Sequence, residues 1–596
     1  MKPFGPDISI GKLAALYASG ETTPEEVIHA VYDRIEQHRA EPIWIDLVPR
    51  GEALKRAKSV EPGPLYGVPF AVKDNMDVAA MPTTAGCPAY AYTPQQTAFA
   101  VEKLLDAGAI LIGKTNMDQF ATGLVGTRSP YGACSSVFDS KYISGGSSSG
   151  SAVAVAQGLV SFSLGTDTAG SGRVPAAFNN IVGLKPTRGV VSTRGVVPAC
   201  RSLDCVSIFA LSCSEAARVL EVAAGFDAVD PYSREWPSRT APMPERLRIG
   251  VVREGQLQFF GDQQAEKLYS QTLSSLEQLE VDIIPIDFDP FRETADLLYA
   301  GPFVAERYAA VGEFVKSHLS LADPTVSSII LGAERYSAAD AYEGEYRLRS
   351  LRRQTEAAWE QVDALLLPTA PTIYEIEEIK QAPLNLNANL GQYTNFVNLL
   401  DLSAVAVPAG FRVDGLPFGV TLVGPAFREH ALLEWGSLIQ SRRAAYVGNL
   451  LVQTPDLPAY KAPRNLSGWV KLAVVGAHLS GQPLHFQLSE RGSRLVSTTK
   501  TGPEYKLYAL TNTMPAKPGL ARVPGFSGSG IEVEVWLMPE ENFGSFVAAV
   551  PPPLSIGSCQ LESGEWVKGF VCEPYGIDSM PDITSYGGWR GYLRSR

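Results

Sequence analysis

The chain has 596 residues, of which 45% are hydrophobic and 19% charged, and its formal net charge is −12. A chain of this length is too long for one hydrophobic core, so two or more domains are expected. The acidic balance argues against nucleic acid or an anionic membrane surface as a main partner.

The first part of the chain alternates between helical and extended patterns. Thr23, Pro24 and Glu26 predict a helix start, with Thr23 as N-cap, Pro24 as first helical residue and Glu26 completing a capping box. Apolar strands and helical stretches then follow one another, at 67–73, 97–107, 109–112, 404–407, 418–423 and 430–443. This alternation predicts a layered α/β domain with a central mixed or parallel sheet.

Residues 108–115, Gly-Ala-Ile-Leu-Ile-Gly-Lys-Thr, match the phosphate-loop pattern GxxxxGK[ST]. A phosphate loop needs a flexible turn whose N–H groups converge on an anion. The four middle residues, Ala-Ile-Leu-Ile, are instead typical of a buried strand. No nucleotide site is therefore predicted here.

Residues 145–187 read GGSSSGSAVAVAQGLVSFSLGTDTAGSGRVPAAFNNIVGLKPT. The pattern predicts a Gly/Ser loop at 145–151, a helix at 152–157, a strand at 160–164 and a second small-residue loop at 166–172. Two such loops around one helix-strand unit bring hydroxyls and backbone N–H groups to one sheet edge, as an oxyanion hole requires. The alternative is a pair of flexible linkers, which rarely alternate so closely with buried apolar elements.

The pattern changes after residue 453. Proline and polar residues dominate 454–468 and predict a linker. Beyond it, β-like segments at 470–476, 504–511 and 530–538 predict a small β-rich α+β domain. The expected boundaries are a first domain at 1–453, the linker at 454–468 and a second domain at 469–596.

The cysteines and the N-terminal segment bear on the compartment. The seven cysteines are odd in number and show no CxxC spacing, which argues against a disulfide framework or a zinc site. The first residues lack the apolar core of a signal peptide, and no run of about eighteen apolar residues occurs. We expect a cytoplasmic protein with no metal and no cofactor.

A serine in these loops needs a base, and histidine is the usual one. The six histidines lie at 29, 38, 318, 430, 478 and 485, so none falls in the segment that holds both loops. His318 and His430 can reach back in space, although both fit surface or helix positions more simply. Lys73, at the end of an apolar strand, is the alternative base, because burial lowers a lysine pKa toward neutrality. On its spacing alone, Lys73 also fits a solvated surface residue.

Lys73 in PFAVKDN, the loop GGSSSGS and the stretch DTAGSGRVPAAFNNIVGLKPT closely resemble the amidase-signature family, over about residues 8–450. The resemblance implies a Ser-Ser-Lys triad, with Ser171 as nucleophile, Ser147 as the bridging serine after a cis peptide bond and Lys73 as the base. It also implies an oxyanion hole made of four backbone N–H groups, those of Thr168, Ala169, Gly170 and Ser171.

Two further segments resemble the allophanate hydrolases of that family. The first is Leu298–Tyr308, where Tyr299 and Arg307 are implied to clamp a substrate carboxylate, with backbone near Gly123 lining the pocket. The alternative for Arg307 is an ion pair with Glu306 on a helix surface.

The second segment, 474–484, resembles the opening of the C-terminal domain of allophanate hydrolases, which is similar to γ-glutamylcyclotransferases. The resemblance makes His478 the candidate that protonates the nitrogen losing CO₂, with 586–590 closing the pocket. The alternatives are a structural histidine and an assembly module.

The resemblance implies hydrolysis of allophanate, a small anionic ureido substrate, to ammonia and N-carboxycarbamate, which the second domain decarboxylates. It further implies a homodimer and a functional link to a biotin-dependent urea carboxylase. Nucleic acid and membrane are not expected as partners, because the chain is acidic. The alternatives are an amidase of other specificity with a structural second domain, and one subunit of an amidotransferase. In a non-enzymatic scaffold, the Gly/Ser loops would be incidental.

Overall fold

A computed structural model describes most of the chain, namely residues 7–237, 247–277, 279, 281–450, 452–453, 457–462, 468–511 and 513–596. It divides into two compact units, each described by itself below. The first comprises Met1–Pro237 and Arg248–Ala462, and the second comprises Ser238–Leu247 and Pro463–Arg596.

The first unit is built on an 11-stranded sheet. Its strands, in sheet order, are β1 (Trp44–Leu47), β3 (Ile110–Thr115), β2 (Pro69–Lys73), β4 (Phe162–Asp167), β6 (Cys205–Ala210), β5 (Val182–Lys185), β10 (Ser403–Phe411), β11 (Pro417–Gly424), β9 (Ala364–Pro368), β7 (Leu247–Val252) and β8 (Val281–Ile286). The sheet is mixed, as predicted. Strands β3, β2 and β4 run parallel, so their carboxyl ends share one edge, whereas β6, β5, β10 and β11 pair antiparallel.

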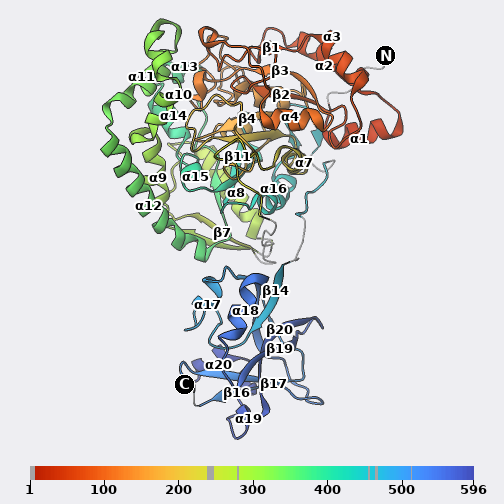
Figure 1. The fold of residues 1–596 in the computed structure, drawn as a ribbon, viewed down its shortest axis with the longest axis vertical. Helices are drawn as coiled ribbons and strands as arrows, with labels where there is room; N and C mark the ends of the chain where they lie inside the picture. The colour runs from red at the N-terminus through yellow and green to blue at the C-terminus, as the bar shows by residue number, and fades with distance from the viewer. Residues whose placement is uncertain are drawn as a thin grey trace. The chain divides into compact units, whose positions relative to one another are not determined.

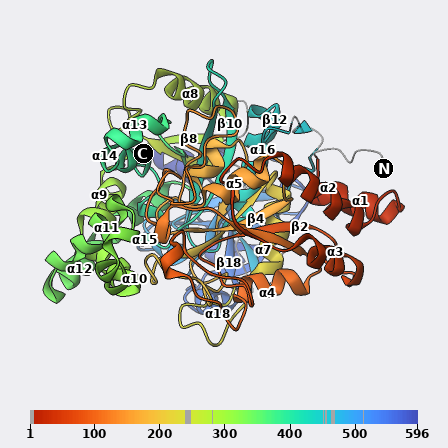
Figure 2. The same cartoon turned by 90° about the horizontal axis from the view of Figure 1, so that it is seen from above.

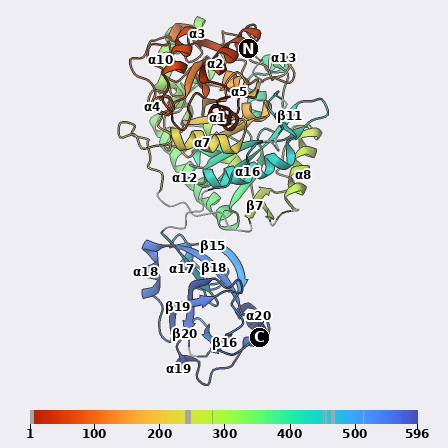
Figure 3. The same ribbon diagram turned by 90° about the vertical axis from the view of Figure 1, so that its right-hand side faces the viewer.

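Helices cover this sheet and fill one flank. They are α1 (Ile10–Ser19), α2 (Pro24–Gln37), α3 (Arg50–Ser59), α4 (Phe99–Asp106), α5 (Ser149–Ala156), α6 (Val174–Phe178), α7 (Cys213–Ala223), α8 (Gln263–Glu277), α9 (Asp289–Ala300), α10 (Ala305–Ser317), α11 (Pro324–Leu331), α12 (Ala338–Gln361), α13 (Ile376–Gln381), α14 (Asn385–Leu390), α15 (Phe396–Leu399) and α16 (Glu429–Arg443). Helices α9 to α12 gather along one flank (Figures 1 and 2), and α7 lies beside α16 (Figure 3).

Several local predictions are confirmed. Helix α2 begins at Pro24 with the full capping box between Thr23 and Glu26. The segment that matches the phosphate-loop pattern is the buried strand β3, as expected. Helix α5 begins at Ser149, inside the region predicted as loop, and all eight of its residues are buried. Small side chains therefore let this helix pack closely against the sheet and against α6.

The second unit has a five-stranded sheet with the order β15 (Arg494–Lys500), β18 (Glu532–Pro539), β14 (Trp469–Val474), β20 (Trp566–Cys572) and β19 (Leu554–Gln560). Strands β16 (Tyr505–Leu510) and β17 (Lys517–Arg522) form a hairpin. The helices are α17 (Phe486–Ser489), α18 (Glu540–Ala548), α19 (Pro574–Ile577) and α20 (Trp589–Arg594). Its hydrophobic core is its own, so the predicted β-rich α+β fold is confirmed.

The segment between the two patterns is described only in part. Strands β12 (Tyr446–Val447) and β13 (Val452–Gln453) pair just before it. Of the linker predicted at 454–468, residues 454–456 and 463–467 lie outside the described residues, so its conformation is not assigned. In the described part of the chain, no helix is long and apolar enough to cross a membrane.

Candidate active site

Lys73 and Ser147 are in direct contact. Lys73 ends β2, and its Nζ lies 2.7 Å from the Ser147 Oγ. Ser147 follows a cis peptide bond with Gly146, in the loop before α5. Both side chains have no exposed surface. The alternative of a solvated surface position for Lys73 is thus excluded, and Lys73 and Ser147 lie within hydrogen-bond distance of one another.

Burial sets the protonation of this lysine. Loss of hydration lowers the pKa of Lys73 to about 7, against an opposing pull from Asp118, Asp204 and Asp167. Lys73 therefore exchanges protons readily at neutral pH, as a general base must. The positive charge of Arg307 also lowers this pKa, by less than the loss of hydration does.

Ser171 lies in the loop that follows β4, and it is buried, with 3% of its surface exposed. A clamp between Asp167 and Arg173 shapes this loop, with Arg173 donating from two nitrogens at 2.8 and 2.9 Å. The Asp167 carboxylate also accepts the N–H groups of Gly170 and Gly172. Among the described residues, the Ser171 hydroxyl makes no hydrogen bond to Ser147, a contact that often tightens only when substrate binds.

The predicted oxyanion hole is partly occupied by the protein itself. The Gly170 N–H donates to Asp167 at 2.8 Å and is therefore engaged. In the described chain, the N–H groups of Thr168, Ala169 and Ser171 donate to no protein acceptor. Those three remain the predicted donors.

Two residues near Lys73, namely Thr166 and Asn75, were not predicted from the sequence. Thr166 Oγ1 accepts a hydrogen bond from Lys73 Nζ at 2.8 Å, and Asn75 donates to the same oxygen. Thr166 directly precedes Asp167 at the end of β4, and β4 runs parallel to β2. The parallel pairing brings the two strand ends together, and because it joins distant segments, no local sequence pattern reports it.

Arg307 is buried, with 1% of its surface exposed, at the start of α10. Its guanidinium donates to Thr122 Oγ1 at 3.0 Å and to the Tyr299 hydroxyl at 3.1 Å, and it lies over the Tyr299 ring. It also donates to the Ala121 carbonyl, so the backbone that leads to Gly123 is next to it. The structure thus brings Arg307 and Tyr299 together, while the predicted role of Gly123 remains a prediction.

The alternative partner for Arg307 is excluded. Glu306 accepts hydrogen bonds from the backbone and hydroxyl of Ser202 and does not pair with Arg307. Among the described residues, no carboxylate forms an ion pair with Arg307, and its Nε has no acceptor. A buried cation left this way is suited to an anionic ligand.

No histidine completes this site in the described structure. His318 is exposed and lies against Phe314, and His430 lies beside Tyr460.

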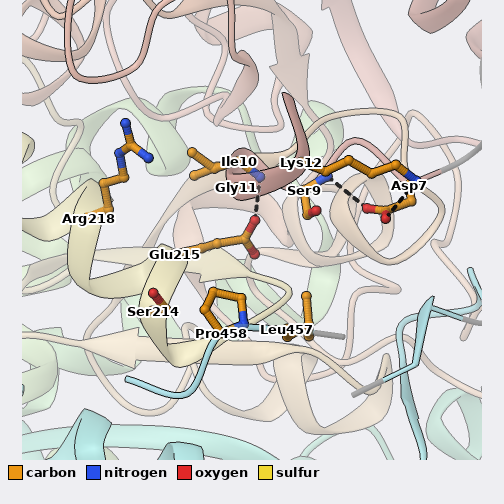
Figure 4. Close-up of a pocket in the computed structure, with 10 residues that line it drawn as sticks. All are labelled: Asp7, Ser9, Ile10, Gly11, Lys12, Ser214, Glu215, Arg218, Leu457 and Pro458. Atoms are coloured by element: carbon orange, nitrogen blue, oxygen red, sulfur yellow. Dashed lines mark hydrogen bonds and ion pairs between the residues drawn. The ribbon is translucent and has the colours of Figure 1, made fainter. Parts of the chain in front are cut away.

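A separate pocket of about 600 Å³ is lined by α1 and α7 (Figure 4), where Glu215 accepts the Ile10 N–H at 2.5 Å. Burial raises the pKa of Glu215 to about 7.

In the second unit, His478 lies in the loop after β14 and lines a cavity of about 170 Å³. Its Nε2 lies 2.9 Å from the Gln487 Oε1. The expectation that 586–590 closes this pocket is wrong, because those residues are not among its lining. Arg590 instead binds Glu532 and Glu534, while Trp589 packs in the core.

Family models match both units of this structure. The Amidase model matches residues 26–433, which hold Lys73, Ser147 and Ser171. The chain belongs to the amidase family. A second model, the allophanate hydrolase C-terminal domain, matches residues 470–594 of this amidase-family chain.

Known proteins resemble the chain over different shares of its length. A urea amidolyase of Lachancea kluyveri is 46% identical over 96% of this chain and 32% of that protein, so the chain spans about a third of that curated relative. The solved structure of an allophanate hydrolase from Kluyveromyces lactis covers 98% of this chain and 99% of its own, at 44% identity and a TM-score of 0.74. One subunit of the glutamyl-tRNA(Gln) amidotransferase of Methanosarcina barkeri is 35% identical over 64% of this chain and 86% of that protein.

Proposed function

We propose that the chain hydrolyses allophanate (urea-1-carboxylate), with Ser171 as nucleophile, Ser147 as relay and Lys73 as base. The observation that carries this proposal is the buried Arg307 cation, which lacks a carboxylate partner in the described chain and whose charge acts on Lys73. A small anionic amide satisfies that cation and presents its carbonyl to the serine. The likeness to an allophanate hydrolase over nearly the whole chain supports it.

In the first step, neutral Lys73 takes the proton of Ser147, which takes that of Ser171. The Ser171 oxygen attacks the terminal amide carbonyl, while N–H groups of the loop, including those of Thr168 and Ala169, stabilise the oxyanion. The C–N bond breaks, and ammonia leaves with the proton that Lys73 returns. Water then releases N-carboxycarbamate from the acyl-enzyme by the same relay.

In the second step, N-carboxycarbamate loses CO₂ in the second unit. One C–N bond breaks, its electron pair stays on nitrogen, and His478 supplies a proton to that nitrogen. The product is carbamate, which decomposes to ammonia and a second CO₂. His478 lines a cavity in its own unit, which supports this role over that of a structural histidine.

The test of the first step is an ammonia assay over allophanate, biuret, malonamate and acetamide. We expect release from allophanate alone, and none from the Ser171→Ala variant, whose fold is checked by circular dichroism. Activity retained in Ser171→Ala excludes the triad. Equal turnover of acetamide excludes Arg307 as a substrate clamp and favours an amidase of other specificity.

We further propose a cytoplasmic homodimer that receives its substrate from a biotin-dependent urea carboxylase. The name of the urea amidolyase relatives supports the link to urea, and seven unpaired cysteines fit a reducing compartment. The amidotransferase alternative is less well supported, because that relative matches only 64% of the chain.

A further inference from the structure

The cavity of the second unit is small, and both apolar and polar groups line it. Its volume is about 170 Å³, and its walls include Leu484, Leu554 and Phe570. Pockets for drug-sized ligands span roughly 300–1,000 Å³, so this one is sized for a molecule of a few heavy atoms.

The charged groups of this cavity carry one sign only. No aspartate or glutamate occurs among its lining residues, whereas Lys517 and the titratable His478 do. Lys517 begins β17 and is half-buried. Within the described residues its ammonium has neither an ion pair nor a hydrogen bond. Burial lowers the pKa of His478, and the positive charge of Lys517 lowers it further. A half-buried ammonium without a counter-charge is suited to an anion, which it binds more strongly than a fully solvated ammonium does.

His478 is fixed beside this cation. Its ring stacks on Phe570 at a centroid distance of 4.9 Å and meets the edge of Phe546 at 5.3 Å. The Gln487 amide oxygen accepts from Nε2, so the neutral ring carries its proton there, and Nδ1 is the nitrogen that must take up the proton that His478 supplies in the proposed decarboxylation. The pocket therefore combines a fixed imidazole with one unneutralised ammonium.

We propose that Lys517 binds a carboxylate of the ligand in this cavity and thereby selects a small dicarboxylate as the substrate of the second unit. This inference rests on the decarboxylation proposed above and adds the residue that recognises the substrate. Lys517 holds the carboxylate that the product keeps. The other carboxylate departs as neutral CO₂, so a cation paired with it would stabilise the reactant over the transition state. Apolar walls around the departing group have the opposite effect.

The kinetic test uses the full chain and follows CO₂ release from allophanate by membrane-inlet mass spectrometry, together with the first ammonia release. For Lys517→Met we expect CO₂ release, above the spontaneous rate, to fall at least about tenfold while the first ammonia release is unchanged. Lys517→Arg restores part of the rate. The matched control is Lys500→Met, which removes an exposed lysine on β15 in the same unit.

The outcomes separate this inference from the function on which it rests. If His478→Ala slows CO₂ release and Lys517→Met does not, the decarboxylase role stands and the Lys517 inference is overturned. If neither variant changes CO₂ release, the second unit has no role in this step and both fall.

A binding measurement tests the anion site without turnover. Malonate, a dicarboxylate of similar size, is titrated calorimetrically into an Arg307→Gln chain, in which the first site has lost its cation. We expect binding that weakens at least about tenfold in the Arg307→Gln, Lys517→Met double variant. Equal malonate binding in the two proteins contradicts the inference, even where Lys517→Met lowers the CO₂ rate.

Discussion

The chemistry of Lys73 depends on a property that the residue acquires only in the folded chain. With its pKa lowered to about 7 by burial, half of the lysine is neutral near pH 7. Only the neutral form accepts a proton, so kcat/KM for ammonia release is expected to rise with pH and level off above an apparent pKa near 7. A pH profile from 5 to 9 measures this.

Substitution of Lys73 by arginine tests the same point, because the guanidinium keeps its charge at every pH of the assay. We expect Lys73→Arg to lower kcat/KM by about 10²–10⁴-fold, the usual contribution of a general base. Lys141→Arg, at an exposed site of the same unit, is the control. A Lys73→Arg enzyme with near-normal rates at pH 8 contradicts the assignment.

The guanidinium of Arg307 has a geometry that a substitution can test. Its fork donates to Thr122 and Tyr299 at once, and a lysine cannot reproduce that geometry. Arg307→Lys is expected to lower kcat/KM for allophanate by about 10- to 100-fold, since hydrogen bonds to charged groups contribute about 1.5–3 kcal/mol. Arg353→Lys, on the exposed face of α12, leaves the rate unchanged. A rate unaffected by Arg307→Lys places substrate recognition elsewhere.

Some of these residues could be predicted from the sequence and others could not. The small-residue loops and the absence of histidine pointed to loop serines and to Lys73, and the family resemblance singled out Ser147 and Ser171. Spacing alone left Lys73 as a surface residue. Its burial follows from the parallel pairing of β2 with β4, a contact between distant segments. For the same reason the contact with Thr166 and the engagement of the Gly170 N–H by Asp167 were not predictable.

At the scale of elements, local signals predicted well wherever the decisive contacts are local. The capping box of α2 joins residues only three positions apart, and β3 is recognisable from its own apolar run. Helix α1 is different, since its first N–H is held by Glu215, 205 positions along the chain. No local pattern in the sequence reports such a contact.

Glu215 makes that contact sensitive to pH. Its pKa is raised to about 7 from an ordinary value of 4.5, so the folded chain binds a proton that the unfolded chain has lost. Stability therefore falls as pH rises from 4.5 to 7, by on the order of 3 kcal/mol, and the loss is complete above pH 7. Glu215→Gln keeps an acceptor for Ile10 and cannot ionise.

We therefore expect the Tm of Glu215→Gln, relative to the original chain, to increase steadily between pH 4.5 and 7 and then stay constant. Differential scanning calorimetry at a series of pH values measures it, with the exposed Glu221→Gln on the same helix as control. A Tm difference that is independent of pH contradicts a protonated Glu215.

At the scale of the whole chain, the two units are separate in their cores and in their candidate sites. The first holds the Ser-Lys pair and Arg307, and the second holds its own core around the His478 cavity. Chain length predicted more than one domain, and the change of pattern after residue 453 predicted a β-rich part beyond it. The pocket walls of the second unit come from strands and loops far apart in sequence. No local sequence motif therefore pointed to Lys517.

Separate sites predict that two inactive variants complement one another. On the proposed mechanism, His478→Ala makes N-carboxycarbamate but does not decarboxylate it, whereas Ser171→Ala makes none but retains an intact second unit. The intermediate is a small, water-soluble dianion that can pass between molecules. We expect an equimolar mixture to release CO₂ from allophanate several-fold faster than His478→Ala alone. A mixture that includes the Ser171→Ala, Lys517→Met double variant in place of Ser171→Ala should give no gain. If the first mixture gives no gain either, the intermediate does not leave the molecule that made it.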